Sequence, residues 1–517
     1  MNKKFKFILT LSILFMFSNL IIATEKNKSR TVITTDGEVD DMNSVIRALY
    51  YSNDMDIEGI VLTSSMYHYA GNEKKGIKPF RWTGTDWIYD FLDKYEKIYP
   101  NLKVHDNSYP TPEYLKYITK IGNISNVGEM EEVTEGSKFL ENLFLKKDSR
   151  KLYVQTWGGT NTTARALKSI EEKYSNNKNW SELKKEISER LVIYIILDQD
   201  DSYGNYIAKK WPEIKIINDR SNFWHFAYAW KFHSEEVNKY LQGQWLYENF
   251  KINHGPLLKK YALMGDGNLI DGELYEEQRG TEEYLEKNPQ YQKYDFISEG
   301  DSPSFLYLID NGLRSMENPS FGGWGGRFNV AKNNLYENVA LDFNPYTNQF
   351  EAEYALMRWF DDIQRDFAAR ADWSVESDYN KANHNPIISV KEGLNIKAKA
   401  GEEVSLTAKG SDPDGDIITY KWWHYGEADS YEESKVSKNP IEYQKAYGLI
   451  FSIYRKLSEN EKIDNIILNV SGNSNEKLKF KVPSDAKKGD TIHIILEGQD
   501  NGKFNLKHYQ RVIITVK

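Results

Sequence analysis

The sequence predicts an α/β domain with an open, mostly parallel sheet flanked by helices, followed by a C-terminal β-sandwich domain. From Arg30 onward, short β-branched and apolar runs alternate with helix-like stretches, which is typical of a parallel sheet covered on both faces. A cluster of aspartates follows the first run, at the kind of strand end where such sheets bind ligands. Beyond residue 388 the pattern changes to alternating strands separated by turns, which indicates a β-sandwich.

The first domain is expected to span residues 30–382. A helix is predicted over 42–51, directly after the first strand. The predicted strands are 31–35 (TVITT), 57–64 (IEGIVLTS), 151–156 (KLYVQT) and 191–197 (LVIYIIL). Because the carboxyl ends of parallel strands meet at one edge of the sheet, the residues just after each strand are the candidates for a ligand site.

The second domain is expected over 388–517, after a linker at 382–388. An acidic turn, SDPDGD, is followed by a strand containing Trp422 and Trp423. This combination resembles the Ig-like and cadherin-like modules that are appended to exported carbohydrate-active proteins. The acidic turn, 411–416, is interpreted either as a calcium site or, preferably, as an ordinary hydrogen-bonded turn. A more helical insertion is expected over 432–474.

The N-terminus has the layout of a secretory signal peptide. Three lysines in the first six residues precede an apolar run, 7–22, and the small residue Ala23. A positive start, a short apolar centre and a small residue near the cut are typical of such signals, so residues 1–23 are expected to be removed. The alternative is a retained membrane anchor. The mature protein is predicted to be secreted or periplasmic, with no membrane span after cleavage.

Charge and composition exclude several functions. The chain has 517 residues and a net charge of -9, and it contains no long run of Lys and Arg, so nucleic acid is not an expected partner. Cysteine is absent, which excludes thiol catalysis, zinc–thiolate sites and lipid attachment at a cysteine. The many aromatic residues (35 Tyr, 23 Phe and 13 Trp) fit stacking on flat ligands or sugars, but an aromatic core accounts for most of them.

The most informative stretch is TTDGEVDD, directly after the first predicted strand. It brings three carboxylates, Asp36, Asp40 and Asp41, into one turn in which Gly37 provides backbone freedom. Such crowding of like charge is unfavourable unless a cation or a substrate hydroxyl compensates for it. A hard divalent cation such as Ca²⁺ is the natural partner for oxygen ligands. The alternative is a solvated acidic loop.

Three motifs in order resemble the nucleoside hydrolase family. They are TVITTDGEVDD at 31–41, VQTWGGTN at 154–161 and EGDSPS at 299–304. HGPL at 254–257 and GGWGGR at 322–327 resemble, more narrowly, the nucleoside hydrolase-like domain of exported proteins that are often labelled cellulose-binding and carry a small C-terminal β-domain. The resemblance implies the fold more strongly than the reaction, since one fold hosts many functions.

The resemblance implies a set of calcium ligands. Asp36 would bind Ca²⁺ and act as the base on a metal-bound water, and Asp41 would be a second ligand. Thr156 would contribute its main-chain carbonyl, and Asp301 would complete the protein ligands. Asp40 would bind a sugar hydroxyl, as in a site for a glycan or ribosyl-type small molecule. Family members often form dimers or tetramers, which implies a homo-oligomer.

Four further residues are candidates for substrate binding. Asn161 ends the second motif, and Trp157 lies within it. Trp324 and Arg327 belong to the glycine-rich GGWGGR segment, where an exposed indole would stack on a sugar ring. For both tryptophans the alternative is a side chain that fills the core.

This sequence departs from the family pattern at three positions. Thr34 stands where the motif has another aspartate, and Gly37 stands where it has a proline. Gly300 replaces the histidine that often precedes the late aspartate and helps the leaving base depart. His68, His225 and His254 could supply an acid from elsewhere, although a structural role is the commoner fate of each.

The leading hypothesis is therefore an exported, calcium-dependent glycosyl-bond hydrolase, a nucleoside hydrolase-like N-glycosidase or a related enzyme. Its Asp36 would activate a metal-bound water, and the transition state would resemble an oxocarbenium ion. The second hypothesis is a carbohydrate-binding protein, for a cellulose-like glycan, on a hydrolase scaffold that has lost catalysis. The third is an exported domain in which calcium is only structural.

Overall fold

A computed structural model describes residues 28–431, 439–446, 449–457 and 476–517. The expected signal peptide, 1–23, lies outside the described residues. Among the described residues, no helix combines the length and the apolar character needed to cross a bilayer.

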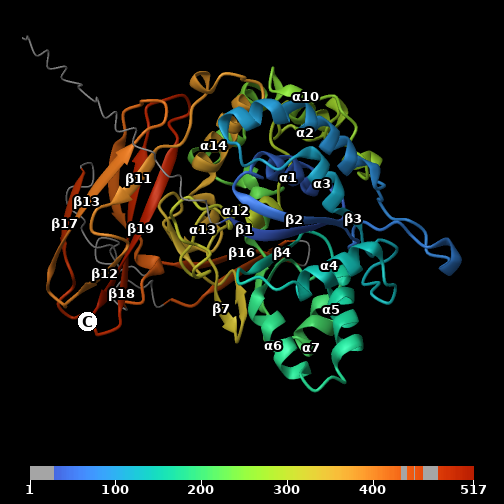
Figure 1. Cartoon of the computed structure of the whole chain (residues 1–517). Helices are drawn as coiled ribbons and strands as arrows, with labels where there is room; N and C mark the ends of the chain where they lie inside the picture. The colour runs from blue at the N-terminus through green and yellow to red at the C-terminus, as the bar shows by residue number, and fades with distance from the viewer. Residues whose placement is uncertain (1–27, 432–438, 447–448, 458–475) are drawn as a thin grey trace, which may run out of the picture.

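The predicted parallel sheet is confirmed (Figure 1). Seven of its eight strands run parallel, and only the edge strand β7 is antiparallel to its neighbour. Side by side, the strands are β3 (Thr119–Ile121), β2 (Met55–Leu62), β1 (Ser29–Thr35), β4 (Leu152–Thr156), β5 (Leu191–Ile196), β6 (Lys215–Asp219), β8 (Leu335–Glu337) and β7 (Asn329–Lys332). All residues of β4 and β5 are buried, as expected for inner strands covered on both faces.

Helices cover both faces of the sheet (Figure 1). One face carries α1 (Val39–Tyr50), α2 (Asp86–His105), α3 (Pro112–Ile118) and α14 (Phe360–Trp373), and the other carries α4 (Glu135–Leu145), α5 (Asn161–Tyr174) and α6 (Trp180–Arg190). The shorter helices are α7 (Ala208–Lys210), α8 (Glu235–Asn238), α9 (Gly243–Leu246), α10 (Gly255–Leu258), α11 (Glu282–Lys287), α12 (Ser302–Leu306) and α13 (Tyr354–Met357).

The first helix begins three residues before the predicted start, at Val39 rather than at residue 42. Asp40 and Asp41 therefore belong to its first turn. There the helix macrodipole and the free N–H groups favour negative charge. Asp40 and Asp41 thus belong to the N-terminus of α1, and strand β1, which ends just before Asp36, positions this turn.

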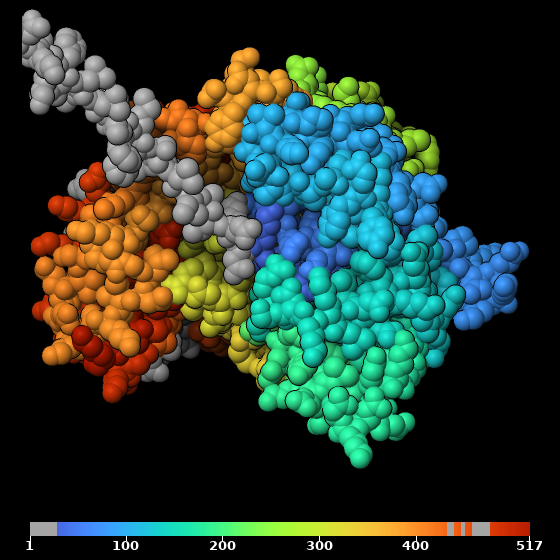
Figure 2. Space-filling model, in the orientation of Figure 1, coloured from blue at the N-terminus to red at the C-terminus, as the bar shows by residue number. Residues whose placement is uncertain are grey.

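The C-terminal β-sandwich is also confirmed. A three-stranded sheet, β11 (Ile387–Val390), β13 (Glu403–Ser411) and β17 (Lys477–Lys481), packs on a four-stranded one, β12 (Asn395–Ala398), β19 (Lys507–Val516), β18 (Thr491–Gln499) and β14 (Thr419–His424). Trp422 is fully buried in the core between them, beside Leu406 and Ile494. Figure 2 shows this part, in orange and red, packed directly against the α/β part.

The prediction of a helical insertion is wrong where the structure describes it. β15 (Glu442–Ala446) and β16 (Leu449–Lys456) are strands, and β16 pairs with β10 (Gln349–Glu351), which pairs with β9 (Asp342–Asn344). Residues 432–438, 447–448 and 458–475 of this insertion lie outside the described residues. Because a strand from the second segment completes a sheet of the first, the division into domains at 382–388 stays a prediction.

Candidate functional site

The carboxylate site lies at the carboxyl ends of the central strands. Asp36 follows β1 directly, and its neighbour across the sheet is the turn after β4, where a Cβ on Gly158 would lie 2.9 Å from the Asp36 carboxyl carbon. Gly37 has a φ of +80°, a value that proline cannot adopt because its ring holds φ near −65°. The glycine that replaces the family's proline therefore belongs to a differently shaped turn.

Three aspartates converge from two elements. Asp40 and Asp41 come from α1 and Asp301 from the turn before α12, and each offers a carboxylate oxygen within 4.8 Å of the others. Asp41 Oδ1 accepts hydrogen bonds from the Thr35 hydroxyl (2.5 Å) and from the Asp36 N–H (3.2 Å). Asp36 lies next to this group, and among the described residues neither of its oxygens has a hydrogen-bond partner.

In the folded protein, the charged forms of Asp36, Asp41 and Asp301 are unfavourable. Burial raises the pKa of Asp36, Asp41 and Asp301 well above the ordinary aspartate value, and the charges of the neighbouring carboxylates raise it further. Asp36 and Asp301 are each only 2% exposed, and both Asp36 oxygens and Asp301 Oδ2 have no hydrogen-bond partner within the described ranges. Buried carboxylates without donors are costly unless a cation compensates for them. The donor set therefore fits a hard divalent cation with oxygen ligands.

Glu38 is a site residue that the sequence analysis did not single out. Its Oε1 is buried without a hydrogen-bond partner, and burial raises its pKa well above the usual value, with further contributions from Asp40 and Asp41. His68 lies beside it, with Nε2 3.9 Å from Glu38 Oε1. The signal was present, because Glu38 belongs to the same TTDGEVDD turn as the three aspartates.

A buried ion pair joins the two elements that carry the aspartates. Arg47 of α1 and Glu299, two residues before Asp301, are both fully buried and interact through two pairs of atoms, one of them at 2.7 Å. Glu299 also accepts hydrogen bonds from the Tyr261 hydroxyl and, at 2.5 Å, from the Ser302 hydroxyl. The pair therefore fixes the distance between the α1 aspartates and Asp301.

The second motif lies beside the cluster, and its polar groups bond within the protein. The Trp157 indole N–H donates to the Ser304 hydroxyl at 2.8 Å, and the indole is buried. The Asn161 amide donates to Ser64 Oγ and to the Asn123 carbonyl, at 3.0 and 2.8 Å. Thr156 ends β4, next to Thr34 of β1. Substrate binding by Trp157 and Asn161 and calcium binding by Thr156 stay predictions.

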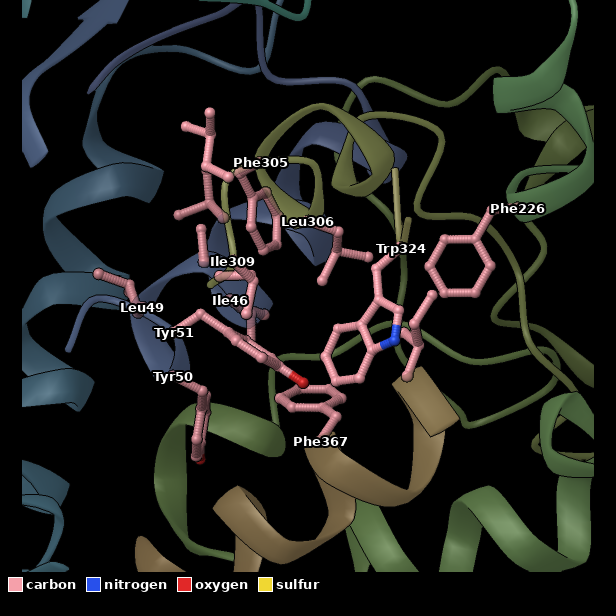
Figure 3. Close-up of a cluster of buried hydrophobic side chains, with 14 of the residues drawn as sticks. Ile46, Leu49, Tyr50, Tyr51, Phe226, Phe305, Leu306, Ile309, Trp324 and Phe367 are labelled. Carbon is pink, nitrogen blue, oxygen red and sulfur yellow. The ribbon is translucent and has the colours of Figure 1, made fainter. Parts of the chain in front are cut away.

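The glycine-rich segment has a structural role in this arrangement. Trp324 is 3% exposed and lies among Phe226, Leu306 and Phe367 in the core (Figure 3), so the expectation of an exposed indole is wrong. The backbone groups of Gly323 and Gly326 hydrogen-bond to each other and form a tight turn around Trp324. Arg327 is also buried, and its Nε donates to Asp342 Oδ1 at 2.7 Å. Substrate binding by Trp324 and Arg327 stays a prediction.

Of the three histidines considered as acids, one lies at the site. Burial lowers the pKa of His68 to about 3, and the Arg81 charge adds to this, so His68 is neutral at pH 7. His225 Nδ1 lies 2.7 Å from Nε2 of His233, and His254 lies 3.1 Å from Asp372, an α14 residue. His225 and His254 therefore interact with His233 and Asp372, respectively, and not with the aspartate cluster.

Gly300 leaves no room for the family's histidine. A Cβ at this position would lie 2.9 Å from Asp40 Oδ2 and 3.3 Å from both Ala227 and Phe223. We therefore expect Gly300→Ala to displace Asp40 and to lower the affinity of the site for a divalent cation by about tenfold, with little change in melting temperature. Isothermal titration calorimetry measures the affinity. Gly204→Ala, at an exposed position of the π-helix η2 (Tyr203–Ile207), is the control, and an unchanged affinity for Gly300→Ala would contradict this packing account.

The fold and the site together define a nucleoside hydrolase-like class of protein. The family model for the nucleoside hydrolase-like domain of cellulose-binding Sde182 matches residues 30–328, more than half of the chain, and the chain belongs to this family. The family model for the C-terminal domain of cellulose-binding protein Sde0182 matches residues 403–516.

One solved structure supports the same assignment. The chain is similar to a nucleoside hydrolase-related protein from Saccharophagus degradans that is described as associated with carbohydrate metabolism. The two share 27% identity, with a TM-score of 0.66, over 95% of this chain and 100% of that one. A plant nucleoside hydrolase matches more distantly, at 11% identity and a TM-score of 0.26, over 60% of this chain and 86% of that one. No functionally curated protein matches the chain.

Proposed function

We propose that this protein is an exported, calcium-dependent hydrolase of a glycosyl bond in a glycan or a ribosyl-type compound. The observation that supports this most directly is the group of buried carboxylates at the strand ends, several of whose oxygens have no hydrogen-bond partner among the residues that the structure describes. Hydrolysis of a glycosyl bond requires a base for water and groups that hold the sugar while positive charge develops on it. Buried carboxylates supply both.

The proposed roles follow from position. Asp36, Asp41, Asp301 and the Thr156 carbonyl would hold Ca²⁺, which would orient a coordinated water and lower its pKa modestly. Asp36 takes up the proton of the attacking water, because neither of its oxygens has a hydrogen-bond partner in the described part of the chain. Asp40, at the start of α1, accepts a hydrogen bond from a sugar hydroxyl. Neutral His68 can orient a polar group but does not act as an imidazolium acid at pH 7.

A second candidate function is carbohydrate binding without hydrolysis. Both matched family models carry the description cellulose-binding, and the segments they match cover most of the chain. Cellulose is an extracellular polymer, which also supports export by the N-terminal segment. In this case the carboxylates would hold a structural cation, and the glycan would bind without being cleaved.

Hydrolysis assays on the mature protein separate these candidates. Inosine, other ribosides and cello-oligosaccharides are incubated with calcium or with a chelator, and the release of reducing sugar is measured. The proposal predicts calcium-dependent release that Asp36→Asn lowers by at least about 100-fold, while Asp93→Asn, an exposed control on α2, retains it. Release that survives both chelation and Asp36→Asn would contradict the mechanism. Glycan binding without release would establish the second candidate.

A further inference from the structure

We propose that a separate pocket beside the aspartate cluster binds a neutral oligosaccharide chain of the β-glucan type. The pocket has a volume of about 900 Å³ and lies between the short helices η3 (Asn222–Phe226) and η4 (Trp230–Phe232), α11, and the sheet that contains β10 and β16. This inference rests on the proposed function only in taking a carbohydrate as the ligand of the protein.

Both segments of the chain build the pocket. Trp224, Tyr228 and Phe232 line it from the η3–η4 segment, whereas Phe451 and Tyr454 line it from β16. Strand β16 reaches this place because it pairs with β10 in antiparallel register. The insertion in the second segment therefore completes a binding surface on the first, which gives this irregular connection a function.

The rim of the pocket is aromatic. The Phe232 ring is 77% exposed although it is a large apolar side chain, and it meets the Phe451 ring edge-on at 6.1 Å between centroids. Trp224 and Tyr454 add two further rings, both half-buried. Exposed rings around a cavity indicate a ligand with apolar faces and polar edges, and a pyranose ring has this character.

The floor of the pocket is polar and accepts hydrogen bonds. Glu351 and Glu353 are buried, and each is oriented by protein donors: Asn344 Nδ2 donates to Glu351 at 2.7 Å, and the Ser452 hydroxyl donates to Glu353. Gln349 and Gln444 place amide groups on the wall beside them. Carboxylates and amides in fixed orientations are suitable partners for several sugar hydroxyls at once.

The charge of the pocket favours a neutral ligand over a phosphate or a nucleotide. Lys456 is the lysine that lines it, and its Nζ lies 3.4 Å from Glu442. His225 and His233 face each other at 2.7 Å between ring nitrogens, which disfavours two positive charges there. Among the described lining residues there is no free cation to hold an anion, and the two buried glutamates offer acceptors for neutral hydroxyl donors.

One wall separates this pocket from the aspartate cluster. Tyr228 lines the pocket, and the Arg279 guanidinium carbon lies 4.8 Å from the centre of its ring. A Cβ added at Gly300 would lie 3.3 Å from Phe223, the neighbour of pocket residue Trp224, and 2.9 Å from Asp40 Oδ2. An oligosaccharide in the pocket would therefore be held on the opposite side of this wall from the carboxylates.

Calorimetric titration of the mature protein with cellohexaose tests the inference. Phe232→Ala and Gln444→Ala remove one wall group from each segment and leave the buried floor intact. Tyr117→Ala is the matched control, since Tyr117 is 72% exposed on α3 outside the pocket. We expect the parent and the control to bind alike and Phe232→Ala to bind about tenfold more weakly, with a smaller loss for Gln444→Ala.

The outcomes distinguish this inference from the proposed function. Absence of cellohexaose binding by the parent, or equal binding by the parent and both pocket variants, overturns the pocket. Loss of binding in the pocket variants without any calcium-dependent hydrolysis supports the pocket and rejects the hydrolase. Calcium-dependent hydrolysis of a riboside by a protein with no affinity for cellohexaose rejects the pocket and supports the hydrolase.

Discussion

Asp41→Asn is expected to lower calcium affinity by at least about 100-fold. The substitution keeps an oxygen that can accept from the Thr35 hydroxyl and the Asp36 N–H, so the turn after β1 retains its hydrogen bonds. It removes the negative charge that faces Asp40 and Asp301 within 4.8 Å. Because the turn keeps its hydrogen bonds, calorimetric titration with CaCl₂ should show the loss without any change in the circular dichroism spectrum.

The same variant should be more stable than the parent when calcium is removed. The raised pKa values of Asp36, Asp41 and Asp301 mean that burial and mutual repulsion disfavour their charged forms in the folded protein. Neutralising one of them relieves that cost. Melting temperatures in a chelator at pH 8 should therefore rise for Asp41→Asn, whereas calcium should stabilise only the parent. A lower melting temperature for the variant in chelator would contradict the charge-crowding account.

Arg47→Met is expected to have the largest effect on stability, a loss of roughly 3–5 kcal/mol in the free energy of unfolding. The change leaves Glu299 charged and without its main partner in a fully buried place. It also removes the guanidinium group that lies 4.0 Å from the Phe367 ring centre. Urea denaturation followed by tryptophan fluorescence measures the loss. Because the pair joins α1 to the turn before Asp301, calcium affinity should fall as well.

Two comparisons make the Arg47 result specific. Lys287→Met removes an exposed ion pair with Glu283, where the pair is 2.6 Å long, and should cost far less because solvent screens the two charges. The double variant Arg47→Met with Glu299→Gln should recover part of the loss, because no unpaired buried charge remains. If Arg47→Met and Lys287→Met cost the same, the ion pair does not hold the site together.

Much of the fold could be predicted because its central strands are buried on both faces. The sequences of β4 and β5 are therefore short apolar runs, which are easy to recognise. Both strands lie within one residue of their predicted bounds. The aspartate cluster was predictable for a related reason, since Asp36 directly follows β1. The start of α1 was harder to place, because Asp40 and Asp41 occupy a helical first turn that resembles a loop in composition.

What could not be predicted depends on contacts between distant segments. Trp324 fills the core because the rings of Phe226 and Phe367, from other elements, surround it, and nothing within GGWGGR signals this. The pairing of β16 with β10 joins residues about a hundred positions apart. The role of Glu299 as the partner of Arg47 is equally remote in sequence, and only the fold brings the two together.

The most direct test of the central claim is the calcium content and affinity of the mature protein, measured beside Asp301→Asn and Asp416→Asn. Asp416 belongs to the second acidic group, with Asp412 and Asp500, in the C-terminal segment, so its variant reports on calcium bound there. The account predicts that the parent binds stoichiometric calcium at the aspartate cluster. Asp301→Asn should lose this calcium, and Asp416→Asn should keep it. A parent protein that binds no metal in calcium-replete buffer, or loses it only in Asp416→Asn, would contradict a catalytic metal site after β1.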